Sequence, residues 1–332
     1  MISSSKNHLR NAVTRFSIRN RIISYPRFKE ALELITRLHM RSLNTDHHGG
    51  LLITGLSGAG KSTIRNEYEG RYPRRDLGEI TVIPVLTVDT PAGPTVKNLA
   101  ESILVALGDP MSHQGSAEHK THRIYYFLKL CKVELLLIDE FQHFVEHAKR
   151  NETLRVTDWL KNLINQARIP VVLFGLPNSE EILRLNVQLA RRFSARYYLR
   201  PFSIYDEQEV REYRGVLKVI ENALPLTTVS LSSPVMAKRF YFATYGLIDY
   251  IGKIVDGAVL LALLENSPTI KEKHYADAFK EEVWRDVAEK LNPFSNNSKL
   301  RPLVKVGEPF ERMTDSLVMK THNDVLKEQA GL

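Results

Sequence analysis

The stretch of this chain with the clearest chemistry is Gly55–Thr63, which reads Gly-Leu-Ser-Gly-Ala-Gly-Lys-Ser-Thr. It fits the phosphate-loop template G-x-x-x-x-G-K-[ST] and follows the apolar run Leu51–Ile53, which predicts a strand before the loop. Glycines let successive backbone N–H groups turn toward phosphate oxygens, and the following helix directs the positive end of its dipole at the same anion. The pattern predicts a site for a nucleoside triphosphate.

Each position of this loop has an expected role. In the template the lysine reaches the β- and γ-phosphates and the next hydroxyl ligates magnesium, so we expect these roles for Lys61 and Ser62. The full set of predicted phosphate-binding residues is Gly55, Ser57, Gly58, Ala59, Gly60, Lys61, Ser62 and Thr63.

A second signal is Leu135–Glu140, an apolar run that ends in two carboxylates. Ligands of open α/β sheets bind outside the carboxyl ends of the strands, where these acids are expected. We expect Asp139 to hold Mg²⁺ through its water shell and Glu140 to orient and polarise the attacking water. ATPases use a glutamate at this position and switch GTPases do not. ATP and Mg²⁺ are therefore the expected cofactors, and ATP hydrolysis is the expected reaction.

Two further features suit hydrolysis. The predicted strand Val171–Gly175 is followed by Asn178, whose side chain could reach the γ-phosphate; a simple turn residue is the alternative interpretation. Three arginines, Arg191, Arg192 and Arg196, lie just before the last predicted strand. They suit an arginine finger that stabilises transition-state charge in a neighbouring subunit's site. Surface charge or contact with a nucleic-acid backbone is the alternative for each of them.

The elements that must position these residues alternate between strand and helix up to about residue 203. Predicted strands cover 51–55, 80–88, 133–138, 171–175 and 197–199, which indicates an α/β fold with a parallel sheet covered on both faces. From 205 onward only helices are predicted, over 206–224, 233–245, 247–265 and 272–291. The predicted domains are a basic arm and helix (1–45), a nucleotide-binding core (46–203), a helical lid (204–291) and a tail (292–332).

Charge is unevenly distributed along the chain. The net charge is +8, and residues 1–41 hold nine Lys and Arg against Glu30 and Glu33, which leaves +7 on this segment. A basic arm attracts polyanions, of which nucleic acid is the commonest. A solvated surface and an organellar transit peptide remain alternatives.

Neither a membrane nor an oxidising compartment is indicated. Cys131 is the single cysteine, no apolar signal-peptide core follows Met1, and the longest apolar stretch, 251–264, is too short to cross a bilayer. We expect a cytoplasmic protein without a membrane partner.

Together these motifs resemble those of the AAA+ ATPases. Within that superfamily the chain resembles the TnsC/TniB transposition regulators, relatives of the replication-initiator clade. More specific echoes are Ile23–Arg27, Leu51–Gly55 and Gln188–Phe193, and the resemblance covers about residues 20–290.

The resemblance implies a P-loop AAA+ sheet with a smaller α-helical lid. It also implies an ATP-dependent ring or filament of the protein around double-stranded DNA, bound without sequence preference. A target-selection protein would recruit it, and it would then license the transposase. Carried onto this chain, Asn178 becomes the first sensor and Arg192 the finger, with Arg191 and Arg196 as substitutes. Ile23 and Tyr25 would line the adenine pocket, although packing of the helix entry explains them equally well.

For DNA, the resemblance points to the inner surface of a ring. The candidate residues there are Lys97, Lys120, Thr121, Arg123, Lys149 and Arg150. Solvated surface charge is the alternative for each. One departure from the initiator pattern is Asp249, which stands where relatives often carry a lid arginine. Lys253 is a possible substitute, and the departure implies slow hydrolysis in which ATP mainly controls assembly.

Three other functions stay open. A replication initiator or helicase loader would share the ATPase motifs, and so would a signalling ATPase that acts without DNA. The third is a zinc peptidase, because His143–His147 matches the inverse zinc-protease pattern H-x-x-E-H.

Overall fold

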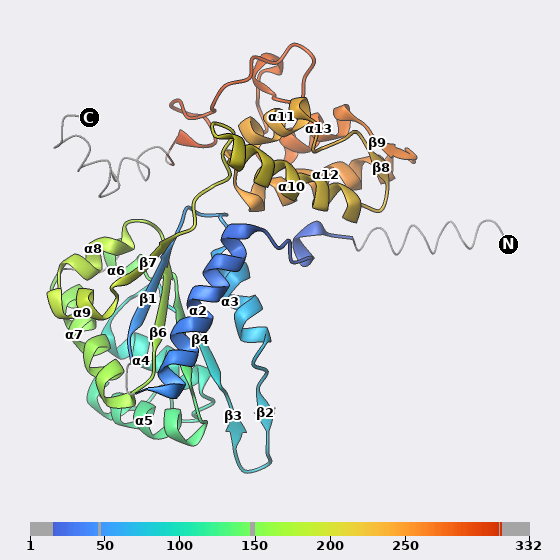
Figure 1. Ribbon diagram of the computed structural model, residues 1–332. Coiled ribbons are helices and arrows are strands. Elements are labelled where there is room, and N and C mark those ends of the chain that lie inside the picture. Colours follow the sequence, from blue (N-terminus) through green and yellow to red (C-terminus); the bar gives the residue numbers. More distant parts are fainter. Residues whose placement is uncertain (1–15, 46–47, 147–149, 312, 314–332) are drawn as a thin grey trace. The chain divides into compact units, whose positions relative to one another are not determined.

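The computed structural model describes residues 16–45, 48–146, 150–311 and 313. Contacts divide the chain into two compact units, each described here by itself (Figure 1). One unit comprises Arg27–Ser57 and Lys61–Leu199. The other comprises Met1–Pro26, Gly58–Gly60 and Arg200–Leu332.

The first unit is built on a five-stranded parallel sheet in the order β4-β5-β6-β1-β7. Its strands are β1 (Gly50–Thr54), β4 (Val85–Asp89), β5 (Leu135–Asp139), β6 (Val171–Gly175) and β7 (Ala195–Tyr198). In a parallel sheet all segments that follow a strand emerge at one edge and all segments that precede one lie at the other. The carboxyl edge therefore holds the phosphate loop and the two carboxylates, and the amino edge holds the residues just before β1 and β7.

Successive side chains of each strand point to opposite faces of the sheet, and both faces are covered by apolar layers. One face packs on α4 (Val96–Ala106), α5 (Ala117–Leu130), α7 (Arg150–Ala167), α8 (Ser179–Arg184) and α9 (Val187–Arg192). On the opposite face lie α2 (Pro26–Asn44) and α3 (Lys61–Gly70), where His39 Nδ1 and the Tyr68 hydroxyl are 3.0 Å apart. The central strands are buried throughout, as expected of a parallel sheet covered on both faces.

Three predicted elements differ in the structure, two of them because of a proline or an asparagine. Pro84 separates the predicted strand 80–88 into β3 (Thr81–Val82) and β4, with β3 pairing instead with β2 (Arg75–Asp76) in a hairpin. The predicted helix 179–190 is two helices, because Asn186 ends the first segment and caps α9 with its side-chain oxygen. The predicted helix 272–291 ends early as α13 (Glu272–Glu282), followed by the 3₁₀ helix η2 (Glu289–Leu291).

The second unit is mainly helical. Its helices are α10 (Glu207–Ala223), α11 (Pro234–Thr244), α12 (Ile248–Leu264) and α13, and a two-residue pairing joins β8 (Thr227–Thr228) to β9 (Thr269–Ile270). The N-terminal 3₁₀ helix η1 (Ile18–Asn20) packs on α12, where Asp256 accepts hydrogen bonds from Ser17 Oγ at 2.6 Å and Ile18 N–H at 2.7 Å.

The described part of the predicted C-terminal tail also packs into this unit. Phe294, Leu303 and Phe310 are buried, and the Phe310 ring lies against Tyr245 and Tyr250, with centroids 5.6 and 5.3 Å apart. Residues 1–15 and 314–332, which hold part of the predicted basic arm and a little under half of the predicted tail, lie outside the described residues. Within the described ranges, no helix is long and apolar enough to cross a membrane.

Candidate functional site

The phosphate loop leaves the sheet directly from β1. Gly55 N–H donates to the Gly175 carbonyl at 3.2 Å, which extends the pairing of β1 with β6 into the start of the loop. Gly58 and Gly60 have φ values of +78° and +102°, a conformation that side chains disfavour. Lys61 then begins α3, and its Nζ donates to the carbonyls of Gly55 at 2.8 Å and Leu56 at 3.0 Å. The predicted strand–loop–helix context is therefore present.

The lysine of the loop is largely removed from water. Burial lowers the pKa of Lys61, while the charges of Asp139 and Glu140 act in the opposite direction. Because burial has removed much of the water around this ammonium, an anion such as a triphosphate would stabilise its charge in place of solvent.

Two hard oxygen donors meet where magnesium is predicted. Ser62 Oγ donates to Asp139 Oδ2 at 3.2 Å, and the other carboxylate oxygen accepts the N–H of Glu140 at 2.8 Å. Mg²⁺ prefers oxygen ligands and keeps several waters, so this hydroxyl and carboxylate fit it. When bound, the metal would neutralise phosphate charge; Ser62 and Asp139 are the residues that would hold it.

Glu140 occupies a strained backbone position. Its φ is +55°, which costs a non-glycine residue about 1–3 kcal/mol. The turn sends Phe141 back into the core, where its N–H donates to the Phe174 carbonyl at 2.9 Å. Strain of this kind persists only where the surroundings hold it, and here it brings a carboxylate to the edge beside Asp139.

Gln142 connects Glu140 to the neighbouring strand end. It is buried, and its Oε1 accepts the N–H of Leu176 at 3.1 Å. Because this backbone donor fixes the carboxamide oxygen, the amide nitrogen faces Glu140 and donates to its carboxylate. The base predicted from the sequence is thus held by a residue that the sequence reasoning did not single out.

Asn178 lies after β6, the strand next to β5, so it shares the carboxyl edge with both carboxylates. Its Nδ2 is 3.5 Å from Glu146 Oε1, and its buried Oδ1 has no hydrogen-bond partner among the described residues. It precedes α8 without capping that helix through its side chain. A buried polar oxygen left over by the fold is compatible with the predicted sensor role, which stays a prediction.

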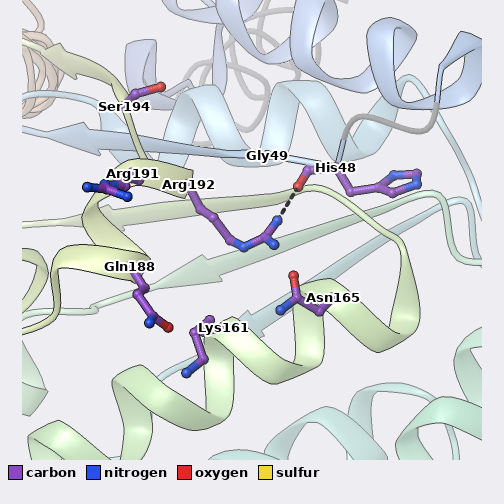
Figure 2. A pocket seen from close by; sticks show the side chains of 8 residues that line it. All are labelled: His48, Gly49, Lys161, Asn165, Gln188, Arg191, Arg192 and Ser194. Carbon is purple, nitrogen blue, oxygen red and sulfur yellow. Dashed lines mark hydrogen bonds between the residues drawn. The ribbon is translucent and has the colours of Figure 1, made fainter.

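At the other edge of the sheet, Arg191 and Arg192 line a cavity of about 460 Å³ (Figure 2). Arg192 turns toward His48 and donates to its carbonyl at 3.3 Å. Arg196 is engaged by Glu180 at 3.5 Å and by the Phe193 carbonyl at 3.4 Å. Arg191 is exposed and makes no hydrogen bond or ion pair with any residue that the structure describes. The geometry therefore favours Arg191, not Arg192, as the arginine that reaches outward.

Two buried apolar residues hold the backbone of the arginine edge, the amino edge of the sheet where Arg191 and Arg192 lie. Phe193 is fully buried and packs on Gly50 so closely that a Cβ there would lie 2.3 Å from its ring. Leu189 is buried on the same short helix, α9. The absence of a side chain at Gly50 therefore leaves room for the Phe193 ring. The buried ring in turn holds the backbone of Arg191 and Arg192, which precede it.

The arginine edge cannot serve the phosphate loop of its own chain. His48 and Arg192 lie before β1 and β7, whereas the loop follows β1, and a five-residue strand spans roughly 16 Å at about 3.3 Å per residue. Any phosphate that Arg191 contacts must therefore belong to another molecule.

Several predicted DNA contacts are accounted for inside the protein. Lys120 is fully buried, with Nζ 2.9 Å from Glu101 and also bonded to the Ser112 carbonyl, so the prediction that it contacts DNA is corrected. Thr121 Oγ1 donates to the Ala117 carbonyl at 2.7 Å and accepts from the Trp159 indole at 2.9 Å.

The other candidates differ in how accessible they are. Arg123 is paired with the buried Asp109 and donates to the Met111 carbonyl at 2.7 Å. Lys97 is exposed near the start of α4. Lys149 lies outside the described residues, and Arg150 is the first residue of α7.

The predicted adenine and second-sensor residues belong to the helical unit. Tyr25 is buried and meets Phe202 edge-on with centroids 4.9 Å apart, and Ile23 is partly exposed; their adenine role stays a prediction. Asp249 stands where a lid arginine was expected, and Lys253 was the possible substitute for that arginine. Lys253 Nζ is 2.7 Å from Asp249, so these two residues form an ion pair with each other.

The zinc pattern lies only partly within the described residues, and no metal cluster is found among those. His143 Nδ1 lies 3.1 Å from the Thr90 carbonyl, and His147 falls outside the described residues. The described part of the chain contains no group of three or more His, Cys, Asp and Glu side chains that could hold a metal.

Sequence reasoning also missed Arg65 and Asp89 beside the magnesium-binding residues. Arg65 Nη1 is 2.9 Å from Asp139 Oδ2 and also pairs with Asp89. Asp89 could have been found from the sequence, because it is a carboxylate at the end of a strand, as Asp139 is.

Comparison with known proteins decides the family. A family model described as bacterial TniB protein matches residues 14–202, more than half of the chain. The chain belongs to the TniB family. No curated protein matches this TniB-family chain.

Solved structures similar to this TniB-family member share its fold at low identity. The Aeropyrum pernix Orc1 protein in complex with DNA has a TM-score of 0.60 and 15% identity over 78% of this chain and 66% of that one. For Cdc6p from Pyrobaculum aerophilum the values are 0.60 and 12% over 85% and 73%. For Drosophila ORC bound to DNA they are 0.57 and 15% over 85% and 66%. The TniB-family chain thus has the initiator-like AAA+ ATPase fold and spans about two thirds of the Orc1 and Drosophila chains.

Proposed function

We propose that this TniB-family protein is an ATP-dependent regulator of DNA transposition. It binds ATP and Mg²⁺ at the carboxyl edge of its sheet and forms a homo-oligomer, ring or filament, on double-stranded DNA. It passes information from a target-selection protein to the transposase, recruiting and activating it. Hydrolysis is slow and serves to time the assembly.

The observation that carries this proposal is the separation of two complementary half-sites. One edge has a phosphate loop with Ser62, Asp139 and Glu140, and the opposite edge has an outward-reaching Arg191. An arginine that stabilises transition-state charge must approach the γ-phosphate. Since its own loop is out of reach, the site is completed when the arginine edge of one copy meets the carboxyl edge of the next. Such a head-to-tail contact generates rings or helical filaments.

Within the proposed mechanism each residue has one task. Lys61 binds the phosphates, while Ser62 and Asp139 would hold the magnesium. Glu140, held by Gln142, takes the proton from the attacking water. The arginine of the neighbouring subunit meets the negative charge that develops on the phosphoryl oxygens.

DNA is the proposed template of the assembly. Two of the fold neighbours were solved with DNA, and the TniB family assignment favours transposition over replication initiation or DNA-independent signalling. The proposed contact set is Lys97, Arg150 at the start of α7, and Lys149, which lies outside the described residues. These residues would track phosphates without reading bases, so binding should weaken steeply as salt rises. We place the protein in the cytoplasm, in keeping with its single, buried Cys131.

The test is assembly of the Glu140→Gln variant, which should bind ATP and not turn it over. Electron micrographs are recorded with ATP alone, duplex DNA alone and both, and Lys61→Ala serves as the variant that cannot bind nucleotide. Rings or filaments that require both ATP and DNA, and that Lys61→Ala does not form, are the expected result. Equal assembly without DNA would favour the signalling ATPase, and no oligomer under any condition would refute the proposal.

A further inference from the structure

Arg65 stands beside the proposed magnesium site although no phosphate-binding template calls for an arginine there. It follows Ser62 by three residues on α3, so both side chains lie on the same face of the helix. Its side chain is 15% exposed, and Nη1 bonds both Asp139 Oδ2, at 2.9 Å, and Asp89. One arginine therefore bridges the last residues of two neighbouring strands.

The sheet register explains why a cation is placed here. Asp89 and Asp139 are direct partners across β4 and β5, so their side chains emerge side by side on the same face of the sheet. Like charges directly opposite each other are destabilising. Arg65 compensates for this repulsion, but it does so on the carboxylate oxygen that also accepts the Ser62 hydroxyl.

The oxygens of Asp139 are nearly fully used. Oδ1 accepts the N–H of Glu140, and Oδ2 accepts from both Ser62 and Arg65. A carboxylate offers about four acceptor positions. A magnesium ion held by Ser62 and Asp139 would have to share Oδ2 with the guanidinium of Arg65. Two cations on one buried carboxylate repel each other.

We infer that Arg65 sets the magnesium affinity of the nucleotide site by competing with the metal for Asp139. Asp89 is the acceptor to which the guanidinium retreats; its side chain is 68% exposed and remains paired with Arg65 when Asp139 is given up. The pair raises the magnesium concentration at which the metal–nucleotide complex forms. This inference rests on nucleotide binding in the proposed function and adds to it a residue that controls when the metal is accepted.

The inference predicts opposite effects from its two members. Arg65→Gln removes the competing charge, so half-saturation should occur at about tenfold lower magnesium. Asp89→Asn removes the negative charge of the alternative acceptor, so the guanidinium is held more strongly by Asp139 and the magnesium requirement should rise. Arg71→Gln is the matched control, because Arg71 directly follows the same helix and pairs with Glu67 on its last turns.

The experiment is a magnesium titration of the binding of a fluorescent ATP analogue to the full-length protein, with thermal unfolding of each variant recorded beside it. Opposite shifts for Arg65→Gln and Asp89→Asn, with no shift for Arg71→Gln, support the inference. A lower unfolding temperature of Arg65→Gln with an unchanged magnesium requirement would overturn it and leave Arg65 a purely structural neutraliser.

Two further outcomes separate this inference from what it rests on. Weaker binding of the analogue by Arg65→Gln in the absence of magnesium would also overturn it, since Arg65 would then contact the nucleotide directly. If the unaltered protein bound no analogue at any magnesium concentration, the proposed function itself would fail.

Discussion

The two edges of the parallel sheet differ in how their charged groups are satisfied. At the carboxyl edge, Asp139 and Glu140 are engaged by Ser62, Arg65 and Gln142 within the same unit. At the amino edge, buried Phe193 fixes the backbone, while Arg191 points outward without a bond to any described residue.

This difference indicates what each edge needs. The carboxyl edge has the groups to hold a nucleotide and its metal, but its described arginine, Arg65, is paired with Asp139 and Asp89. The amino edge has the exposed Arg191 and lies at the opposite end of the strands from the phosphate loop. The proposed function explains this arrangement by an ATPase that is complete only in an assembly, and on that proposal its rate is a measure of subunit contact.

The largest expected effect comes from Arg191→Ala. A finger arginine is worth about 10³- to 10⁵-fold in turnover, so ATP hydrolysis by the assembled protein should fall by about 10³-fold while nucleotide affinity is kept. Arg192→Ala is the comparison, since Arg192 is bound to the His48 carbonyl, and it should lose much less. Turnover assays on DNA decide between them. If turnover fell more in Arg192→Ala, Arg192 would be the finger residue. If turnover fell in neither variant, this edge would have no catalytic role.

Glu140→Gln tests the opposite edge. A positioned general base contributes about 10²- to 10⁴-fold, so turnover should fall by at least about 10²-fold. The affinity for ATP, measured by equilibrium binding, should stay the same because Glu140 contacts no part of the phosphate loop through hydrogen bonds. Unchanged turnover would show that another group activates the water.

Gln142→Met sharpens the account of the carboxyl edge. The change keeps the volume but removes the donor to Glu140 and the acceptor for Leu176, so kcat should fall about tenfold with little change in KM. Gln142→Glu keeps the acceptor, loses the donor and adds a like charge beside Glu140, so its kcat loss should be at least as large; a loss in Gln142→Met alone would place the effect in the contact with Leu176. A wild-type kcat in both would show that Gln142 only fills space.

Gly50→Ala is the mildest of these changes and acts on the amino edge. The added methyl meets the buried Phe193 ring, and overpacking of this kind costs about 1–3 kcal/mol. We expect a lower unfolding temperature and a severalfold loss of turnover with normal ATP affinity. Gly70→Ala is the control, because nothing lies within 4 Å of its added Cβ. If ATP affinity fell instead, the two edges would not be independent.

Local pattern was sufficient to predict the sheet, the phosphate loop and the two strand-end carboxylates. These depend on short segments: glycines in a loop, an apolar run, and acids at its end. The break at Pro84 and the cap at Asn186 were visible in the sequence but were outweighed by the apolar periodicity on either side.

The contacts of Arg65, Gln142 and Lys120 could not be predicted in the same way. Each depends on a partner far along the chain: Arg65 on Asp139 through the strand register, Gln142 on Leu176 of the next strand end, and Lys120 on Glu101 of the neighbouring helix. A lysine in a basic helix suggests a surface charge, and only the packing of α5 on α4 shows that this one is buried. The preference for Arg191 over Arg192 likewise depends on the His48 carbonyl.

The central claim, a catalytic site shared between subunits, is tested most directly by mixing two inactive variants. Glu140→Gln carries an intact arginine edge and Arg191→Ala an intact carboxyl edge. If subunits assemble at random on DNA, about one interface in four of an equal mixture has both edges intact. The account predicts that ATP hydrolysis, negligible for either variant alone, recovers toward a quarter of the wild-type rate on mixing. A mixture as inactive as its components, or an Arg191→Ala variant that hydrolyses ATP normally as a monomer, would contradict it.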